Sequence, residues 1–206
     1  LSYLPVRNTS NLRGHVSRCS SRQGKKEKDS LLSFPQTGRP CGAAWSRQGE
    51  MSLRFHSLQV MTLALLTAKR LELSEAELQD LATAALFHDC GVARLQDSVR
   101  ISGGSGNRLE QDAYQSHVLY SVEMAKSSSI VSKPALAAIL THHEAINGTG
   151  YPKKLSGEEI PLLSRILAVA DRYDYLVNPP ASPVGMTPAE VLARLFQQEG
   201  AKFDKR

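Results

Sequence analysis

The sequence predicts an all-α protein, a bundle of helices without a β-sheet. After about residue 50, apolar residues recur at spacings of three and four, which is the period of one helix face. Residues 74–77 (Ser-Glu-Ala-Glu) and 187–190 (Thr-Pro-Ala-Glu) have the capping-box pattern that starts a helix. No segment shows a convincing alternation of apolar and polar residues, as a half-buried strand would. These three observations together define the fold class.

The first three helices are expected at residues 53–71, 75–88 and 109–126. In the first, Leu58, Met61 and Leu65 are spaced by three and four residues along one face. The capping box at residues 74–77 begins the second helix, which is expected to run to His88. The Ser-, Gly- and Asn-rich segment 102–107 separates the second helix from the third because such a composition indicates a loop.

Proline residues mark the starts of the later helices. Pro134 and Pro161 each stand in the first turn of a predicted helix, where the missing N–H is harmless. The helix of Pro134 is expected to end near His142, and that of Pro161 near Leu176. The Pro-rich segment 178–183 then breaks the chain, and the capping box at residues 187–190 begins a last helix that ends near residue 199.

The composition is that of one ordinary domain preceded by a basic segment. At 206 residues and 41% hydrophobic content, the chain can bury a core of its own. Residues 1–50 hold nine Lys/Arg against three Asp/Glu, and the remaining residues hold sixteen against seventeen. The net charge of +5 therefore belongs to the first fifty residues. Because residues 51–206 are nearly neutral, the sequence does not indicate DNA binding.

Residues 1–50 are expected to be disordered because they show no sustained helical or strand period. Their Arg- and Ser-rich composition fits an organellar transit peptide, but we favour a linker from an upstream domain or a translated non-coding stretch before Met51. No apolar run could span a bilayer. The three cysteines form neither a disulfide framework nor a zinc motif, which indicates a reducing, cytoplasmic compartment.

Histidine and aspartate residues form an ordered series along the predicted domain, and five of the six histidines belong to it. Imidazole and carboxylate groups bind borderline divalent metals, and two close ions need ligands from more than one helix. A lone histidine is more often a packed core residue than a ligand. Asp89 is expected to bridge two ions because a carboxylate has two oxygens. The members of the series are His56, His88, Asp89, His117, His142, His143 and Asp171.

From about residue 52 to residue 204, the chain resembles the HD-GYP family, a branch of the HD-domain metal-dependent phosphohydrolases. The matching stretches are residues 88–91 (HDCG), residues 142–152 (HHEAINGTGYP) and residues 160–162 (IPL) leading into 165–171 (RILAVAD). The resemblance implies an HD-type helical bundle with an interior two-metal site over residues 51–206. The family normally continues into a further helix at the point where this sequence stops. Truncation of the domain at this end is therefore an open alternative.

The resemblance also implies the ligands of each ion. One ion, iron or manganese, would be held by His56, His88, Asp89 and Asp171. The second would be held by His117, His142 and His143. Asp174 and Glu144 are expected to hydrogen-bond to neighbouring groups rather than to bind metal.

The implied activity is that of a cyclic di-GMP phosphodiesterase, in which a hydroxide held between two metal ions attacks phosphorus. The implied catalytic residues are Asp89 and His88. The implied substrate-binding residues are Gly148, Gly150, Tyr151, Pro152 and Arg165. The resemblance further suggests a signalling role, with an upstream sensory domain or a homodimer.

The departures from the family concern the substrate more than the metal. Val92 stands where the family usually has a lysine that meets a substrate phosphate, and residues 180–183 lack the family's basic segment. Ser52 replaces a glutamate that holds a third metal in some members. Arg94, Lys153, Lys154 and Arg165 are candidate replacements for the missing cations. Two alternatives therefore stay open: a phosphohydrolase acting on another nucleotide or phosphoester, and a metal-binding signalling module with little turnover.

Overall fold

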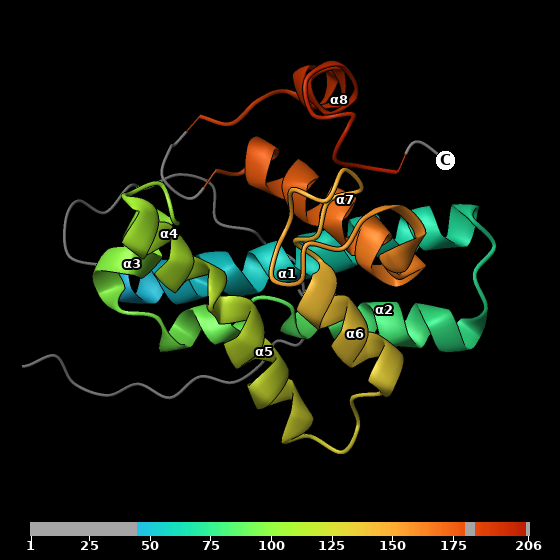
Figure 1. Ribbon diagram of the computed structural model, residues 1–206, viewed down its shortest axis with the longest axis horizontal. Helices are drawn as coiled ribbons and strands as arrows, with labels where there is room; N and C mark the ends of the chain where they lie inside the picture. Colours follow the sequence, from blue (N-terminus) through green and yellow to red (C-terminus); the bar gives the residue numbers. More distant parts are fainter. Residues whose placement is uncertain (1–44, 180–183, 205–206) are drawn as a thin grey trace, which may run out of the picture. The chain divides into compact units, whose positions relative to one another are not determined.

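The computed structural model describes residues 45–179 and 184–204, with side chains from residue 55 onward. These residues form helices and no β-strand, which confirms the predicted fold class (Figure 1). The elements are α1 (Trp45–Arg70), α2 (Glu75–Phe87), η1 (Cys90–Arg94), α3 (Asp97–Ser102), α4 (Arg108–Gln115), α5 (His117–Lys126), α6 (Lys133–Thr141), η2 (Gly157–Glu159), α7 (Leu162–Val177) and α8 (Pro188–Gln197). None of the described helices has the length and apolar content needed to cross a membrane.

Helices α1, α2, α5, α6 and α7 pack around one hydrophobic core. Its larger side chains include Leu81 of α2, Ile139 of α6 and Leu167 of α7, all of which are fully buried. Alanines make up much of the rest of this core, so the helix backbones can approach one another closely. A smaller cluster of Val191, Leu195 and Leu176 holds α8 against the end of α7.

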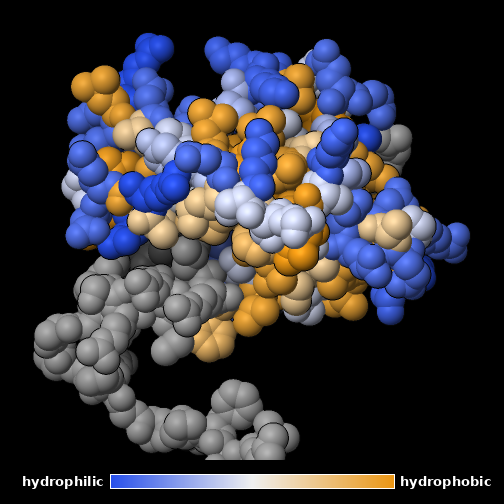
Figure 2. All heavy atoms as spheres, turned by 90° about the horizontal axis from the view of Figure 1, so that it is seen from below, coloured by the Kyte–Doolittle hydropathy of each residue, from blue (hydrophilic) through white to orange (hydrophobic). Residues whose placement is uncertain are grey.

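Large apolar side chains are also exposed on the surface formed by the described residues. On the face in Figure 2, hydrophobic side chains are spread among hydrophilic ones. The exposed large apolar side chains come from several helices, for example Leu66 of α1, Leu119 of α5 and Phe196 of α8. The feature that sets this bundle apart lies in its interior.

The helix starts that the sequence predicted are confirmed by their capping contacts. The backbone N–H of Glu77 donates to Ser74 Oγ at 3.4 Å, and the backbone N–H of Ser74 donates to the Glu77 carboxylate at 2.9 Å. Thr187 and Glu190 make the same reciprocal pair at the start of α8. At the start of α6, Ser132 Oγ accepts the backbone N–H of Ala135 at 3.1 Å.

The single helix predicted at residues 109–126 is wrong, because the structure has two helices there that meet at Ser116. The hydroxyl of Ser116 donates to the carbonyl of Ala113 at 2.5 Å, and a side chain bonded to its own helix in this way competes with helix continuation. The short elements η1, α3 and η2 were not predicted from the sequence. Helix α1 begins at Trp45, eight residues before the predicted start.

Two predictions concern parts of the chain outside the described residues. The disorder expected for the N-terminal segment falls largely on residues 1–44, and the missing basic segment falls on residues 180–183. The domain boundary at residue 51 stays a prediction, although the α1 backbone already includes residues 45–50.

Candidate metal centre

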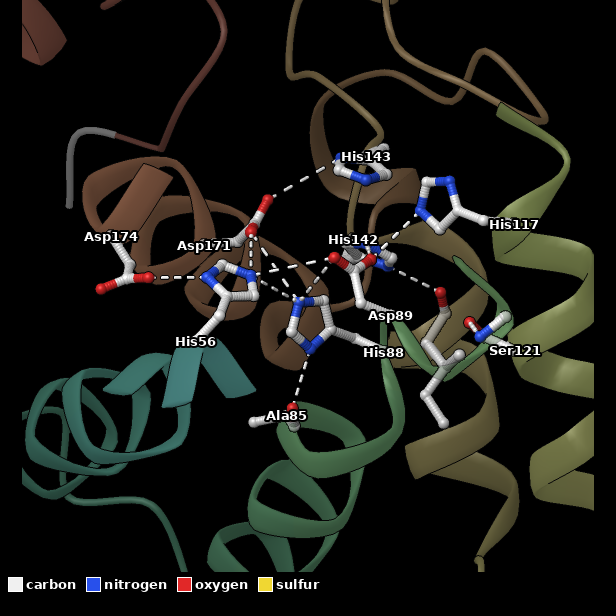
Figure 3. A network of polar contacts seen from close by, with 12 residues as sticks. His56, Ala85, His88, Asp89, His117, Ser121, His142, His143, Asp171 and Asp174 are labelled. Carbon is white, nitrogen blue, oxygen red and sulfur yellow. Dashed lines mark hydrogen bonds and ion pairs between the residues drawn. The ribbon is translucent and has the colours of Figure 1, made fainter. Parts of the chain in front are cut away.

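The seven predicted ligand residues meet at one place inside the bundle (Figure 3). They come from α1, the end of α2, the start of α5, the end of α6 and the middle of α7. They form two groups, and within each group the ligand atoms lie within 4.8 Å of one another. The first group is His56, His88 and Asp171, and the second is Asp89, His117, His142 and His143.

Asp89 lies between the two groups. Its Oδ2 is 3.8 Å from His56 Nε2 and 3.7 Å from His88 Nε2. Its Oδ1 is 3.2 Å from His117 Nε2 and 3.8 Å from His142 Nε2. One oxygen therefore faces each group, which is the arrangement that a bridging carboxylate requires. The grouping differs from the implied ligand sets only at Asp89, which belongs with the second group while also facing the first.

Three of the histidines are oriented by the ends of the helices that precede them. His88 and His142 are the C-cap residues of α2 and α6, and His117 directly follows the C-cap of α4. The last carbonyls of a helix lack an intrahelical partner. In each case the histidine Nδ1 donates to a carbonyl three residues earlier, which leaves Nε2 directed at the cluster. These carbonyls belong to Ala85 (2.7 Å), Tyr114 (2.6 Å) and Ile139 (2.8 Å).

Three buried atoms in the cluster have no hydrogen-bond partner among the described residues. They are Asp89 Oδ1, His117 Nε2 and His142 Nε2. Buried polar atoms without partners are costly, and most proteins avoid them. Here the unpartnered atoms are the ones that face one another, and imidazole nitrogen and carboxylate oxygen are both metal ligands. The residues therefore fit a divalent metal centre.

Asp174 orients His56 toward the centre. His56 Nδ1 donates to Asp174 Oδ2 at 2.6 Å, and the His56 Nε2 lies 3.1 Å from Asp171 Oδ1. Asp174 is buried, and its other oxygen accepts the side-chain amide of Asn178 at 2.8 Å. A carboxylate behind a histidine fixes the ring and raises its basicity toward a metal. This contact agrees with the expectation that Asp174 hydrogen-bonds to a neighbouring group.

Replacing Asp174 by asparagine is expected to weaken metal retention while leaving the helical content unchanged. The amide keeps the size of the side chain but loses the negative charge behind His56. The loss of such a partner lowers metal affinity by about 10- to 100-fold. A chelator titration followed by metal analysis measures the effect, with the exposed residue Asp112 replaced by asparagine as the control. Equal retention in both variants contradicts the orienting role.

The ionisable groups of the cluster shift one another's pKa values. Burial alone would raise the pKa of Asp89 and Asp171, but the surrounding histidines outweigh it and hold both pKa values well below the ordinary range. Burial lowers the pKa of His142 and His143, so both imidazoles are neutral at pH 7, as a metal ligand must be. Burial acts against protonation of His56 as well, but Asp171 and Asp174 raise its pKa to about 10.

These shifts make metal binding a competition with protons. The pKa values of His88 and His117 are also raised, because their contacts with the neighbouring aspartates outweigh burial. In the metal-free protein, His56 holds a proton at neutral pH that a metal cation has to displace. Metal affinity should therefore rise with pH through the neutral range.

Glu144 closes the glycine-rich loop instead of joining the cluster. Its buried carboxylate accepts the backbone N–H groups of Lys153 at 2.6 Å and Leu155 at 3.0 Å. These two bonds tie the far end of the loop back to the residue that follows the histidine pair. The expectation that Glu144 bonds to neighbouring groups rather than to a metal agrees with these contacts.

The loop from residue 147 to residue 152 lies directly against His143. The backbone N–H of Tyr151 donates to the His143 carbonyl at 3.1 Å, and the two rings lie 4.8 Å apart at an angle of 30°. A Cβ added to Gly150 would lie 2.5 Å from that same carbonyl, so only glycine permits this approach. Gly148 has a φ of +77°, and Pro152 follows a cis peptide bond. The loop therefore borders the second group of ligands.

The predicted cations are held by other partners. The guanidinium of Arg165 contacts Asp204 at 2.7 Å and Glu158 at 3.3 Å, and its side chain is only 9% exposed. Arg94 contacts Glu123 at 2.7 Å. Substrate binding by Arg165 thus stays a prediction that its contacts do not favour.

The position of the missing lysine is buried. Val92 of η1 is 8% exposed, while Lys153 and Lys154, just after the loop, are exposed.

One residue beside the centre was not predicted from the sequence. Tyr114 stands one helical turn before His117, and its ring lies 4.9 Å from that of His117. An aromatic residue three positions before a candidate ligand is the signal that could have identified it.

Comparison with known proteins connects this geometry to a family. The HD domain family model matches residues 35–206. The chain is 38% identical over 146 residues to the cyclic di-GMP phosphodiesterase response regulator RpfG of Xanthomonas campestris, covering 70% of this chain and 38% of that protein. It is 32% identical over 135 residues to 3'3'-cGAMP-specific phosphodiesterase 2 of Vibrio cholerae, covering 65% of this chain and 26% of that protein. The chain thus spans well under half the length of either relative.

Solved structures show the same fold. Bd1817, an HDG"Y"P protein from Bdellovibrio bacteriovorus, superposes with a TM-score of 0.61 at 23% identity, covering 74% of this chain and 48% of that one. The HD domain of the phosphodiesterase PgpH from L. monocytogenes superposes with a TM-score of 0.51 at 14% identity, covering 72% of this chain and 80% of that one. The helical arrangement around the cluster is therefore shared with experimentally determined proteins.

Proposed function

This chain belongs to the HD domain family, and from that premise we propose that it is a metal-dependent phosphodiesterase that opens cyclic di-GMP. The observation that carries the proposal is the position of Asp89, with one oxygen toward each of two groups of ligands. A centre built for a single ion would not need a carboxylate that faces two groups of candidate ligands. The named activities of the relatives supply the substrate class.

We assign two divalent ions, iron or manganese, to the centre. Two such ions, when bound, lower the pKa of a water molecule and stabilise charge on the attacking and leaving oxygens of a phosphoryl displacement. Asp89 and His88 are the residues to which we give the catalytic role. Asp89 contributes an ionised carboxylate to both groups, and the bond from His88 to the Ala85 carbonyl keeps its Nε2 directed inward.

The loop beside His143 is the proposed substrate contact. Gly148 and Gly150 let its backbone approach the centre, and Tyr151 and Pro152 form its rim. The backbone N–H groups of Gly148 and Tyr151 already donate to the carbonyls of Ala145 and His143, so the proposed contact is made by the rim of the loop.

A second substrate is favoured by one specific observation. The relatives include proteins named for cyclic di-GMP and proteins named for 3'3'-cGAMP, and this chain lacks the lysine that the family places near a phosphate. Another cyclic dinucleotide or phosphoester is therefore the alternative substrate. A metal-binding module with little turnover is the alternative that involves no catalysis.

The deciding experiment incubates the full chain with cyclic di-GMP or 3'3'-cGAMP in the presence of Mn²⁺ or Fe²⁺ and separates the nucleotides. Linear product from cyclic di-GMP supports the proposal. Product from 3'3'-cGAMP alone supports the alternative substrate. Loaded protein that cleaves neither nucleotide nor a generic activated phosphodiester supports the signalling module.

The metal content provides a separate prediction. Seven ligand residues in two groups imply about two ions per chain. Elemental analysis of protein prepared with iron and manganese available measures this number directly, with circular dichroism as the check that the protein is folded. A content well below one ion per folded chain contradicts the proposed centre.

A further inference from the structure

Two tyrosines flank the second group of ligands, and Tyr114 is the one to which no role has been given. Its ring lies 4.9 Å from the ring of His117. Tyr151 lies on the other side, 4.8 Å from His143 and 6.5 Å from His117. The two aromatic rings therefore border the same three-histidine face of the centre.

The ring of Tyr114 is held in place from two sides. On one side it contacts His117, and on the other it packs against the loop that precedes α4. A Cβ added to Gly104 of this loop would lie 3.2 Å from the Cβ, Cγ and Cδ1 atoms of Tyr114. The ring of Tyr114 therefore packs between His117 and Gly104, and these contacts fix its orientation in the protein without a ligand.

The hydroxyl of Tyr114 makes no hydrogen bond to another described residue, and it is not one of the buried atoms that lack a partner. It can therefore donate to a bound ligand without breaking a bond to a described residue. A phenylalanine would fill the slot between Gly104 and His117 equally well, so packing alone does not account for the hydroxyl. A phenol hydroxyl is protonated at neutral pH and can therefore donate a hydrogen bond.

Phosphate groups need donors, and among the candidate cations only Lys153 and Lys154, exposed just after the loop, have no carboxylate partner among the described residues. Val92 offers none, and the guanidinium groups of Arg94 and Arg165 are paired with carboxylates. Arg172, next to the ligand Asp171, is likewise bonded twice to Glu199, at 2.7 and 2.9 Å. A neutral O–H donor beside His117 would compensate in part for the missing cation.

We propose that Tyr114 is a substrate-binding residue whose hydroxyl donates a hydrogen bond to a non-bridging oxygen of the phosphodiester. This inference rests on the proposed function, because it places the phosphate at the metal centre. It makes Tyr114, rather than a lysine or arginine, the side chain that orients the phosphate on the His117 side.

The test compares the full chain with Tyr114→Phe, which keeps the ring and removes only the hydroxyl. The control is Tyr120→Phe, since Tyr120 lies on α5 beside Arg94, with 5.9 Å between the guanidinium and the ring. All three proteins are loaded with Mn²⁺. Calorimetry measures the binding of inorganic phosphate, and hydrolysis of bis(p-nitrophenyl) phosphate gives kcat and KM.

Tyr114→Phe is expected to weaken phosphate binding and raise KM by roughly ten-fold, the effect of losing one hydrogen bond to a charged group. Its metal content, kcat and melting temperature should match those of the control. Unchanged phosphate binding in Tyr114→Phe overturns the proposal. So does a loss of metal that accounts for the weaker binding, because Tyr114 would then only position His117. A loaded wild-type protein that neither binds phosphate nor cleaves the ester defeats the proposed function itself, which is a different result.

Discussion

Asp89→Ala is expected to abolish phosphodiester hydrolysis and to lower the metal content of a protein that still folds. The methyl group removes both oxygens that lie between the two ligand groups. It also removes the negative charge that faces four imidazole nitrogens, so cations are no longer attracted to the space between the groups. The activity should fall on the order of a thousand-fold or more, the size that losing a central electrostatic contact produces.

A generic activated phosphodiester is the proper substrate for this measurement, because its cleavage does not depend on nucleotide recognition. Asp89→Asn adds a finer comparison, since the amide keeps one oxygen and the shape of the side chain but not the charge. Asp112→Ala, at an exposed position of α4, controls for the loss of an aspartate elsewhere. Full metal content and activity in Asp89→Ala would falsify the bridging assignment.

Most helices could be predicted because their signals are local. A capping box involves residues three apart, and a proline in the first turn affects only its own backbone. The starts of α2, α6, α7 and α8 accordingly match the prediction closely. The break at Ser116 is different. There, the Ser116 hydroxyl bonds to the Ala113 carbonyl, and the His117 ring bonds to the Tyr114 carbonyl. The spacing of apolar residues in the sequence does not predict these side-chain bonds to the helix backbone.

The sequence identified the seven candidate ligand residues but not their geometry. The motifs supplied the seven residues, and the family resemblance implied how they divide between two ions, but neither showed that Asp89 lies between the two groups. The position of Asp89 between the groups depends on how the end of α2 meets α5. Arg165 and Asp204 are 39 residues apart in the sequence. Their contact therefore depends on the folded chain and could not be predicted from a local pattern. The same holds for the ring of Tyr114 against His117, where the break after α4 places the ring.

Gly91→Ala is expected to destabilise this protein strongly, although it adds only one methyl group. A Cβ at this position would lie 2.1 Å from the His117 carbonyl oxygen and 2.4 Å from the Ser121 backbone nitrogen. Both are backbone atoms of α5, so no side chain can rotate away, and η1 has to separate from α5. The bond from the Gly91 N–H to Ser121 Oγ, now 2.8 Å, would be lost with the contact. We expect a destabilisation of about 3 kcal/mol or more, at the upper end for overpacking.

The consequence reaches the metal centre because Asp89 precedes Gly91 by two residues. Moving η1 away from α5 carries Asp89 away from His117, whose Nε2 is now 3.2 Å from Oδ1. The matched control is Gly103→Ala, at a φ of +56° with no atom within 4 Å of the added Cβ, where only backbone strain of about 1–2 kcal/mol applies. Thermal melting and metal analysis of both variants separate the two effects. If Gly91→Ala melts like Gly103→Ala and keeps its metal, the approach of η1 to α5 is not what places Asp89 between the two ligand groups.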